Sequence, residues 1–329
     1  MAEAVPYIMC NNFADCHFAY QILYRAPFLI LDCEGNNLGR AGGCVTLICV
    51  GTPLAEHIFI FDTLSPALSP HDLAPLWNLF SNPLLVKIVW DGRMDYLEIW
   101  STYKVRLEGV LDLQVAEVVS RTTLRGEGEE HRLGRLAATY FSNNAVQKHK
   151  EQYEGINVLI GLQQCCQDCG LGEHFVKDPE VKQMHKDKKA DMWIQRPLPE
   201  KLLQYAAKDI QLISQLCTAF IQKGWIPPVP GPYHTLLAQC ARYVSAHVEQ
   251  GKSAETDPFR PTGLMPLDVL TQPWGYQFKC TGCNRSMSMS CYTLDLPDNF
   301  YRRRRPRCKL CHVLAMKYRL RVDREWFVI

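Results

Sequence analysis

Three consecutive runs of β-branched and aromatic residues constrain the fold more than any other feature of this sequence. They are FLILD at 28–32, CVTLICV at 44–50 and HIFIFD at 57–62. Each run has the composition and length of a buried strand, and the turns between them are short. Strands joined by short turns pair antiparallel with their neighbours. The sequence therefore predicts an antiparallel meander over residues 28–62.

The segment after the meander alternates between the two periodicities. Residues 70–80 have helical spacing, LLVKIVWD at 84–91 predicts a strand that ends on an acid, and residues 92–103 return to helical spacing. Beyond Val110 the pattern is mainly helical. We therefore expect an α/β fold. The later predicted helices are 110–121, 132–141, 156–170 and 199–224, the last preceded by Pro197 and Pro199 and ended by Gly224.

The composition excludes a membrane-spanning or disordered chain. With 47% hydrophobic residues in 329, the chain can form one large domain and a smaller one. No apolar run approaches the roughly eighteen residues of a membrane span, and no signal-peptide pattern is present. Fifteen cysteines in such a chain favour buried thiols or metal ligands over disulfides. We expect an intracellular protein, nuclear or cytoplasmic, with no membrane partner.

Two acids, Asp32 and Glu34, end the first predicted strand together. Residues i and i+2 of a strand point to the same face, so the two carboxylates repel each other. Either the strand emerges into water there, or a divalent cation such as Mg²⁺ or Mn²⁺ offsets the repulsion. Further acids favour the cation. Asp95 follows the strand 84–91, and Tyr205 and Asp209 share one face of the long helix 199–224.

These segments together resemble the successive motifs of the DEDDy 3′-5′ exonucleases, the group that contains RNase D and the Werner exonuclease domain. The likeness is greatest to the Egalitarian-related exonuclease-domain proteins and covers about residues 8–222. The segments are LDCEG, KIVWDGRMD, LDLQVAE and RPLPEKLLQYAAKD. The resemblance implies a ribonuclease H-like mixed sheet flanked by helices. It assigns Asp32 and Glu34 to the first motif, Asp95 to the second, and Tyr205 with Asp209 to the third.

The resemblance implies a hydrolase that removes nucleotides from the 3′ end of single-stranded nucleic acid with two Mg²⁺ or Mn²⁺ ions. On this hypothesis Asp32 bridges the ions, Glu34 and Asp209 complete the site that activates water, and Asp95 serves the leaving oxygen. Tyr205 orients the water. The alternative is a weak or inactive RNA-binding adaptor on the same fold, but all four carboxylates and the tyrosine are present, which favours the nuclease.

The second motif departs from the family pattern. The family often has an asparagine and an aromatic residue before its aspartate, whereas this chain has WDGRMD. Asp91 is therefore either a helix cap or an acid that lies near the metal ligands without binding the metal itself.

Four cysteines in the C-terminal part have the spacing of a zinc site. CTGC at 280–283 and CKLC at 308–311 form two C-x-x-C pairs, which predicts a zinc-ribbon-like module with a structural Zn²⁺ and a hairpin turning at LPDN (296–299). Free thiols are the alternative. The predicted ligands are Cys280, Cys283, Cys308 and Cys311, with Cys291 and His312 as spare candidates.

A second cysteine group, Cys165, Cys166 and Cys169 with His174, lies in an apolar helical pattern. This pattern favours core packing over metal binding.

The C-terminal segment is also basic. From Pro273 to Ile329 it has twelve Lys or Arg against four Asp or Glu, interleaved with Tyr301, Tyr318 and Trp326. This combination favours single-stranded nucleic acid, although a solvated charge run, a nuclear import signal or a protein partner of the zinc module fits as well. The candidate nucleic-acid-binding residues are Arg302, Arg303, Arg304, Arg305, Arg307 and Lys309.

Composition also suggests how the chain divides. We expect an exonuclease domain at 1–225, a proline-rich connector with one helix at 226–262, and a basic zinc-ribbon-like module with the four cysteines at 263–329.

Overall fold

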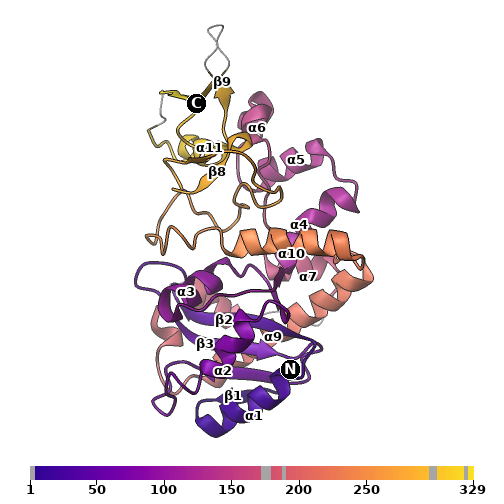
Figure 1. Cartoon of the computed structure of the whole chain (residues 1–329), viewed down its shortest axis with the longest axis vertical. Coiled ribbons are helices and arrows are strands. Elements are labelled where there is room, and N and C mark those ends of the chain that lie inside the picture. The colour runs from indigo at the N-terminus through magenta and orange to yellow at the C-terminus, as the bar shows by residue number, and fades with distance from the viewer. Residues whose placement is uncertain (1–3, 172–178, 187–189, 296–301, 322–324) are drawn as a thin grey trace. The chain divides into compact units, whose positions relative to one another are not determined.

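The computed structural model describes residues 4–171, 179–186, 190–295, 302–321 and 325–329 (Figure 1). The chain forms two compact units. The first comprises Met1–Glu117 and Ile160–Lys252, and the second comprises Val118–Leu159 and Ser253–Ile329.

A six-stranded mixed sheet forms the centre of the first unit. Its spatial order is β1-β4-β3-β2-β5-β6. The three central strands of the predicted meander pair antiparallel, whereas the flanking pairs β1–β4, β2–β5 and β5–β6 are parallel. The predicted mixed α/β fold is confirmed. The strands are β1 (Ile8–Cys10), β2 (Phe28–Asn36), β3 (Cys44–Gly51), β4 (Ile58–Asp62), β5 (Val86–Val89) and β6 (Val110–Asp112).

Helices flank this sheet. The longest, α9, packs against β2, β3, β4 and β5. It starts directly after a proline and buries an apolar stripe that includes Leu202, Ala206 and Ile210. The helices of this unit are α1 (Phe13–Leu23), α2 (Ala74–Ser81), α3 (Arg93–Tyr103), α7 (Leu162–Asp168), α8 (Pro179–Lys186), α9 (Glu200–Gln222) and α10 (Pro230–Val244), and α4 (Leu113–Thr123) begins in it.

Two local predictions need correction, and two elements were missed. Residues 110–112 are strand β6 rather than helix, because they add a parallel edge to β5. Residues 156–161 are not helical, and Val158 bridges to Leu264 instead. The elements β1 and α1 were not predicted. Short strands and helices with little periodicity owe their conformation to tertiary contacts rather than to pattern.

The second unit combines helices from the middle of the chain with the cysteine-rich segment. One core contains Leu133, Leu136 and Ile156 together with Cys280 and Cys311. The C-terminal segment therefore shares its core with residues 118–159. The elements are α5 (Glu129–Thr139), α6 (Asn143–Lys148), β7 (Gln277–Lys279), β8 (Ser286–Ser288), β9 (Leu294–Asp295), β10 (Arg303–Arg304), α11 (Lys309–Lys317) and β11 (Phe327–Val328).

Packing groups the residues differently from the predicted division at 225 and 262. Helix α10 contacts β6 and α3, so residues 226–252 pack into the first unit, and residues 253–262 belong to the second. None of the helices in the described part of the chain is both long and apolar enough to cross a membrane.

Lys87 on β5 is buried, and its Nζ donates hydrogen bonds to the carbonyl oxygens of Leu79 (3.3 Å) and Asn82 (2.7 Å). Burial lowers the pKa of Lys87 to about 7, against an opposing effect of Glu108. The unfolded chain therefore binds one more proton than the folded chain between about pH 7 and the ordinary value of 10.5. In that range the wild-type contribution of Lys87 to stability rises with pH.

We expect the stability of the wild type relative to Lys87→Met to rise by at most about 1.4 kcal/mol per pH unit over this range. Urea unfolding of both proteins at several pH values measures the difference. A difference that stays constant with pH would show that Lys87 keeps its charge on folding.

Candidate active site

Two segments far apart in sequence bring three of the predicted acids together. Asp32 and Glu34 lie on β2, and Asp209 lies on α9, which packs against that strand. One carboxylate oxygen from each of the three lies within 4.8 Å of the others. Glu34 and Asp209 are buried, and Asp32 is half-buried. Carboxylates at this spacing match the ligands that hard divalent cations prefer.

The fourth acid, Asp95, adjoins this cluster from the first turn of α3, where it is buried. Burial raises the pKa of Asp95 well above its ordinary value, and the neighbouring Asp32 carboxylate adds to the effect. The structure thus places Asp95 near Asp32, beside rather than within the three-residue cluster.

Tyr205 lies on α9 one helical turn before Asp209, as the sequence spacing predicts. It is half-buried, and its ring lies 6.4 Å, between centroids, from the buried indole of Trp193. The aromatic neighbour limits the ring's freedom on the face of α9 that carries Asp209.

The glycine-rich turn after Glu34 packs against α3. A Cβ on Gly39, which has a φ of +69°, would lie 2.5 Å from the Met94 sulfur. The Gly39 amide also donates to Glu98 Oε2 at 3.1 Å, and Lys252 Nζ pairs with the other Glu98 oxygen at 2.6 Å. The positive φ and the close contact with α3, the helix that carries Asp95, therefore explain why residue 39 is a glycine.

A buried aspartate holds the turn that precedes Asp95. Asp112, at the end of β6, accepts hydrogen bonds from the amides of Gly92 (2.9 Å) and Gln114 (2.9 Å) and, more weakly, of Asp91 (3.2 Å). Burial nevertheless raises the pKa of Asp112 to about 7, because these amide bonds only partly offset the loss of hydration.

Asp91 is an acid outside the three-residue cluster. It adopts a φ of +53° and forms a two-pronged ion pair with the buried Arg93, with nitrogen–oxygen distances of 2.6 and 2.8 Å. This pair accounts for the departure in the second motif, since the aspartate and the arginine neutralise each other inside the turn.

Helix α10 also supports this turn, which the sequence did not indicate. The Tyr243 hydroxyl lies 2.5 Å from Gln114 Oε1 and 3.1 Å from Asp91 Oδ1. The Arg93 guanidinium lies 4.7 Å from the centre of the Tyr243 ring. The connector helix of the prediction therefore buttresses the segment that carries Asp95. No spacing motif marks Tyr243, because only the fold brings it to the turn.

On the hypothesis that the acid cluster binds Mg²⁺ for nucleotide release, we expect Tyr243→Phe to raise the Mg²⁺ concentration needed for half-maximal activity about 10- to 100-fold, because residues that support metal ligands fix their orientation. Since the ring stays in place, the fold should be kept, and loss of the buried hydroxyl should cost about 1–3 kcal/mol of stability. Tyr233→Phe, on the same helix, is the matched control. Equal Mg²⁺ requirements in the two variants would contradict a positioning role for Tyr243.

The four predicted zinc ligands also come together, in the second unit. The sulfur atoms of Cys280, Cys283, Cys308 and Cys311 lie within 4.8 Å of one another, and all four residues are buried. Backbone amides of Cys308 (3.2 Å) and Gly282 (3.3 Å) donate to Cys280 Sγ. Gly282 is required there, since a Cβ would lie 2.9 Å from Cys311 Sγ.

The spare ligands are not in this cluster. Cys291 Sγ donates to Asp268 at 3.0 Å, and four sulfurs suit a tetrahedral ion without His312. Strands β9 and β10 pair antiparallel as a hairpin requires, but its predicted turn lies outside the described residues.

The second cysteine group is part of the first unit's core. Cys165 and Cys166 are buried in α7, in agreement with the packing interpretation, and Cys169 is half-buried. His174 lies outside the described residues.

Most of the predicted basic surface residues are engaged within their own unit. Arg304 is buried, with its guanidinium 4.9 Å from the centre of the Phe278 ring and 4.6 Å from that of Tyr292. It packs as part of the core, so we withdraw it from the candidate nucleic-acid contacts. Arg302 is exposed, and the other four residues of the set are partly exposed. Each of these four has a partner: Arg303 pairs with Asp295, Arg305 stacks on Trp326, Arg307 donates to the Arg321 carbonyl, and Lys309 pairs with Glu154.

Residues 11–161 match the family model of the 3′-5′ exonuclease domain. This match confirms the resemblance that the sequence motifs indicate. No curated protein gives a significant match to the chain.

Solved structures of low sequence identity share the fold. RNase D of Trypanosoma brucei is 20% identical, with a TM-score of 0.59. The alignment covers 86% of this chain and 83% of the RNase D chain. The same enzyme in complex with RNA U12 gives 22% identity and a TM-score of 0.59, covering 85% and 83%. The EXO domain of Aedes aegypti Nibbler is 17% identical with a TM-score of 0.50, covering 72% of this chain and 100% of its own.

Proposed function

From the 3′-5′ exonuclease domain that this chain carries over residues 11–161, we propose that it hydrolyses single-stranded nucleic acid from the 3′ end in a reaction that requires divalent metal. The observation that carries the proposal is the convergence of Asp32, Glu34 and Asp209 from β2 and α9 within 4.8 Å. A divalent cation would offset the repulsion among carboxylates this close, and their oxygens are the ligands that such cations prefer.

The donor set fits Mg²⁺ or Mn²⁺. Asp32, Glu34 and Asp209 would hold the ions with Asp95 completing the set, and each offers the hard oxygen ligands that these cations select. Two bound ions would supply the charge that stabilises the attacking and the leaving oxygen of a phosphodiester.

The protein's own residues then position the reactants. The Tyr205 hydroxyl, one turn before Asp209, would orient the attacking water by a hydrogen bond. A tyrosine hydroxyl can both donate and accept a hydrogen bond, so the role proposed for Tyr205 is orientation of the water. The turn held by Asp112 and Tyr243 would fix the position of Asp95.

We propose RNA as the first substrate to test, since the Trypanosoma brucei RNase D that shares this fold has been solved with RNA U12. The accessible members of the basic set would add phosphate contacts from the second unit, or would bind a protein partner. Arg302, Arg303, Arg305, Arg307 and Lys309 form this proposed surface.

We also propose one structural Zn²⁺ on Cys280, Cys283, Cys308 and Cys311, which four buried sulfurs support. We propose a reducing compartment, nuclear or cytoplasmic, because fifteen cysteines in a chain of this length and composition favour buried thiols or metal ligands over disulfides.

The experiment is release of nucleotides from 5′-labelled single-stranded RNA and DNA with Mg²⁺ or Mn²⁺, beside EDTA controls. Stepwise shortening from the 3′ end that EDTA abolishes is the expected result. Tight binding with intact ends would instead identify the adaptor alternative.

A further inference from the structure

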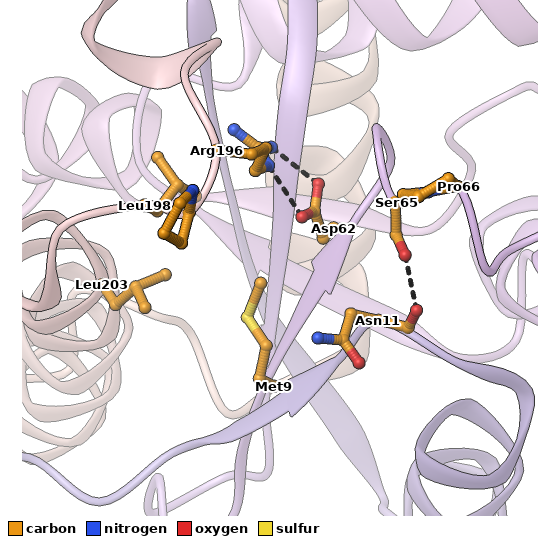
Figure 2. Close-up of a pocket in the computed structure, with 9 residues that line it drawn as sticks. Met9, Asn11, Asp62, Ser65, Pro66, Arg196, Leu198 and Leu203 are labelled. Atoms are coloured by element: carbon orange, nitrogen blue, oxygen red, sulfur yellow. Dashed lines mark hydrogen bonds and ion pairs between the residues drawn. The ribbon is translucent and has the colours of Figure 1, made fainter.

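An ion pair outside the acid cluster joins the end of strand β4 to the segment that leads into α9. Arg196 donates from Nε and Nη2 to the two carboxylate oxygens of Asp62, at 2.8 and 2.6 Å, as drawn in Figure 2. Asp62 is the last residue of β4 and is buried, and its Oδ1 also accepts from the Leu64 amide at 3.0 Å. A two-pronged pair on such a carboxylate fixes the plane of the guanidinium as well as its position.

On one side Arg196 borders a cavity of about 450 Å³, whose lining Figure 2 shows. The walls come from β1, β4, the segment after β4 and the segment that leads into α9, with Met9, Leu198 and Leu203 among the apolar side chains. A side chain at the edge of a cavity lacks packing contacts on that side. Hydrogen bonds rather than neighbouring atoms therefore fix the direction of the guanidinium.

The third guanidinium nitrogen holds the backbone before α9. Arg196 Nη1 donates to the carbonyl oxygens of Trp193 (2.8 Å), Ile194 (3.2 Å) and Gln195 (3.2 Å). The first of these residues ends the short helix η2 (Ala190–Trp193). The backbone thus bends around the guanidinium, and the arginine couples the position of η2 to the end of β4.

Trp193 carries this coupling to Tyr205. Its indole is 1% exposed, and η2 packs against β2, the strand that carries Asp32 and Glu34. The rings of Trp193 and Tyr205 lie 6.4 Å apart, between centroids, with 55° between their planes. Because an enclosed indole cannot turn away freely, a shift of its backbone would displace the tyrosine ring beside it.

We propose that the Asp62–Arg196 pair positions the Tyr205 hydroxyl, acting through Trp193. This role rests on the proposed function, in which Tyr205 orients the attacking water. The pair acts on the tyrosine rather than on the proposed metal ligands, because Trp193 packs on Tyr205, whereas Asp209 lies one turn further along α9. Its loss would therefore slow the chemical step and leave substrate binding and the metal requirement almost unchanged.

Arg196→Lys tests this role in a protein that should still fold. The lysine keeps a positive charge beside the buried Asp62, but a single ammonium cannot hold both Asp62 oxygens and the Trp193 carbonyl. We expect kcat for nucleotide release to fall about 10- to 100-fold, with KM and the Mg²⁺ concentration for half-maximal activity little changed. Lys201→Met is the matched control, since it breaks an exposed ion pair with Glu180 (2.7 Å) in the first turn of the same helix.

Combination with Tyr205→Phe separates positioning from a general weakening of the fold. In the Tyr205→Phe background, Arg196→Lys should lower kcat by less than about 2-fold, because the hydroxyl on which the pair acts is gone. A merely structural role would give the same loss of kcat in both backgrounds, and that result would overturn the inference.

The tyrosine ring offers a readout that needs no activity. In protein labelled with fluorotyrosine, the fluorine NMR line of Tyr205 is the one that Tyr205→Phe removes. Arg196→Lys should shift or broaden that line, and Lys201→Met should leave it in place. An unmoved line in Arg196→Lys overturns the inference alone. A wild type that releases no nucleotides with Mg²⁺ or Mn²⁺ overturns the proposed function and, with it, the role of the pair in the reaction.

Discussion

Asp209→Asn is expected to lower the rate of nucleotide release on the order of a thousand-fold or more without unfolding the protein. The substitution keeps the size of the side chain but removes one negative charge from a cluster whose oxygens lie within 4.8 Å. The proposed metal ions would then lose a ligand charge, while repulsion among the remaining carboxylates falls. The thermal midpoint without divalent metal should therefore stay equal or rise.

Asp168→Asn is the matched control, because Asp168 is an exposed acid on α7 of the same unit. Rates with and without Mg²⁺ and thermal midpoints should be measured for both variants. An Asp209→Asn protein that keeps a rate close to that of the control would exclude Asp209 as a metal ligand.

Removal of the proposed zinc is the second change with a large expected effect. Cys280→Ser should abolish stoichiometric zinc binding and unfold the second unit. Structural zinc contributes roughly 10–16 kcal/mol in small peptides, which exceeds the net stability of most domains. The four cysteines also lie in the same core as Leu133, Leu136 and Ile156. Loosening that core should expose residues 118–159 as well as the C-terminal segment.

The measurements are zinc content by elemental analysis and limited proteolysis mapped along the chain. Cys291→Ser is the matched control, since Cys291 is buried in the same core but contacts Asp268 rather than the sulfur cluster. Equal zinc content in the two variants, or cleavage confined to residues 263–329, would contradict the expectation.

The proposed catalytic acids show how much the sequence motifs could predict. Asp32 and Glu34 were predicted to share a face because strand geometry has a period of two, and Tyr205 and Asp209 because a helical turn has 3.6 residues. Local periodicity fixes such relations within one element, and the structure agrees. The family motifs then related the elements to one another, and Asp209 does reach the two acids on β2. Each C-x-x-C pair is local in sequence, whereas the shared core of the second unit brings the two pairs, and so the four proposed zinc ligands, together.

The basic segment shows where composition alone is insufficient. All the arginines of RRRRPR were predicted as candidate contacts to nucleic acid, yet alternate residues of a strand point to opposite faces, and β10 buries Arg304 against aromatic rings. A run of like charges does not reveal which members a strand turns inward.

Periodicity and spacing within a few residues were enough to predict the α/β class, the meander, the acid motifs and the cysteine pairs. They could not predict that α10 supports the turn before Asp95 or that residues 118–159 share a core with the cysteine segment. Nor could they predict that Asp62 and Arg196, 134 positions apart, form one wall of a cavity. Such contacts join residues far apart in the chain, and their energy comes from packing and pairing that no local pattern records.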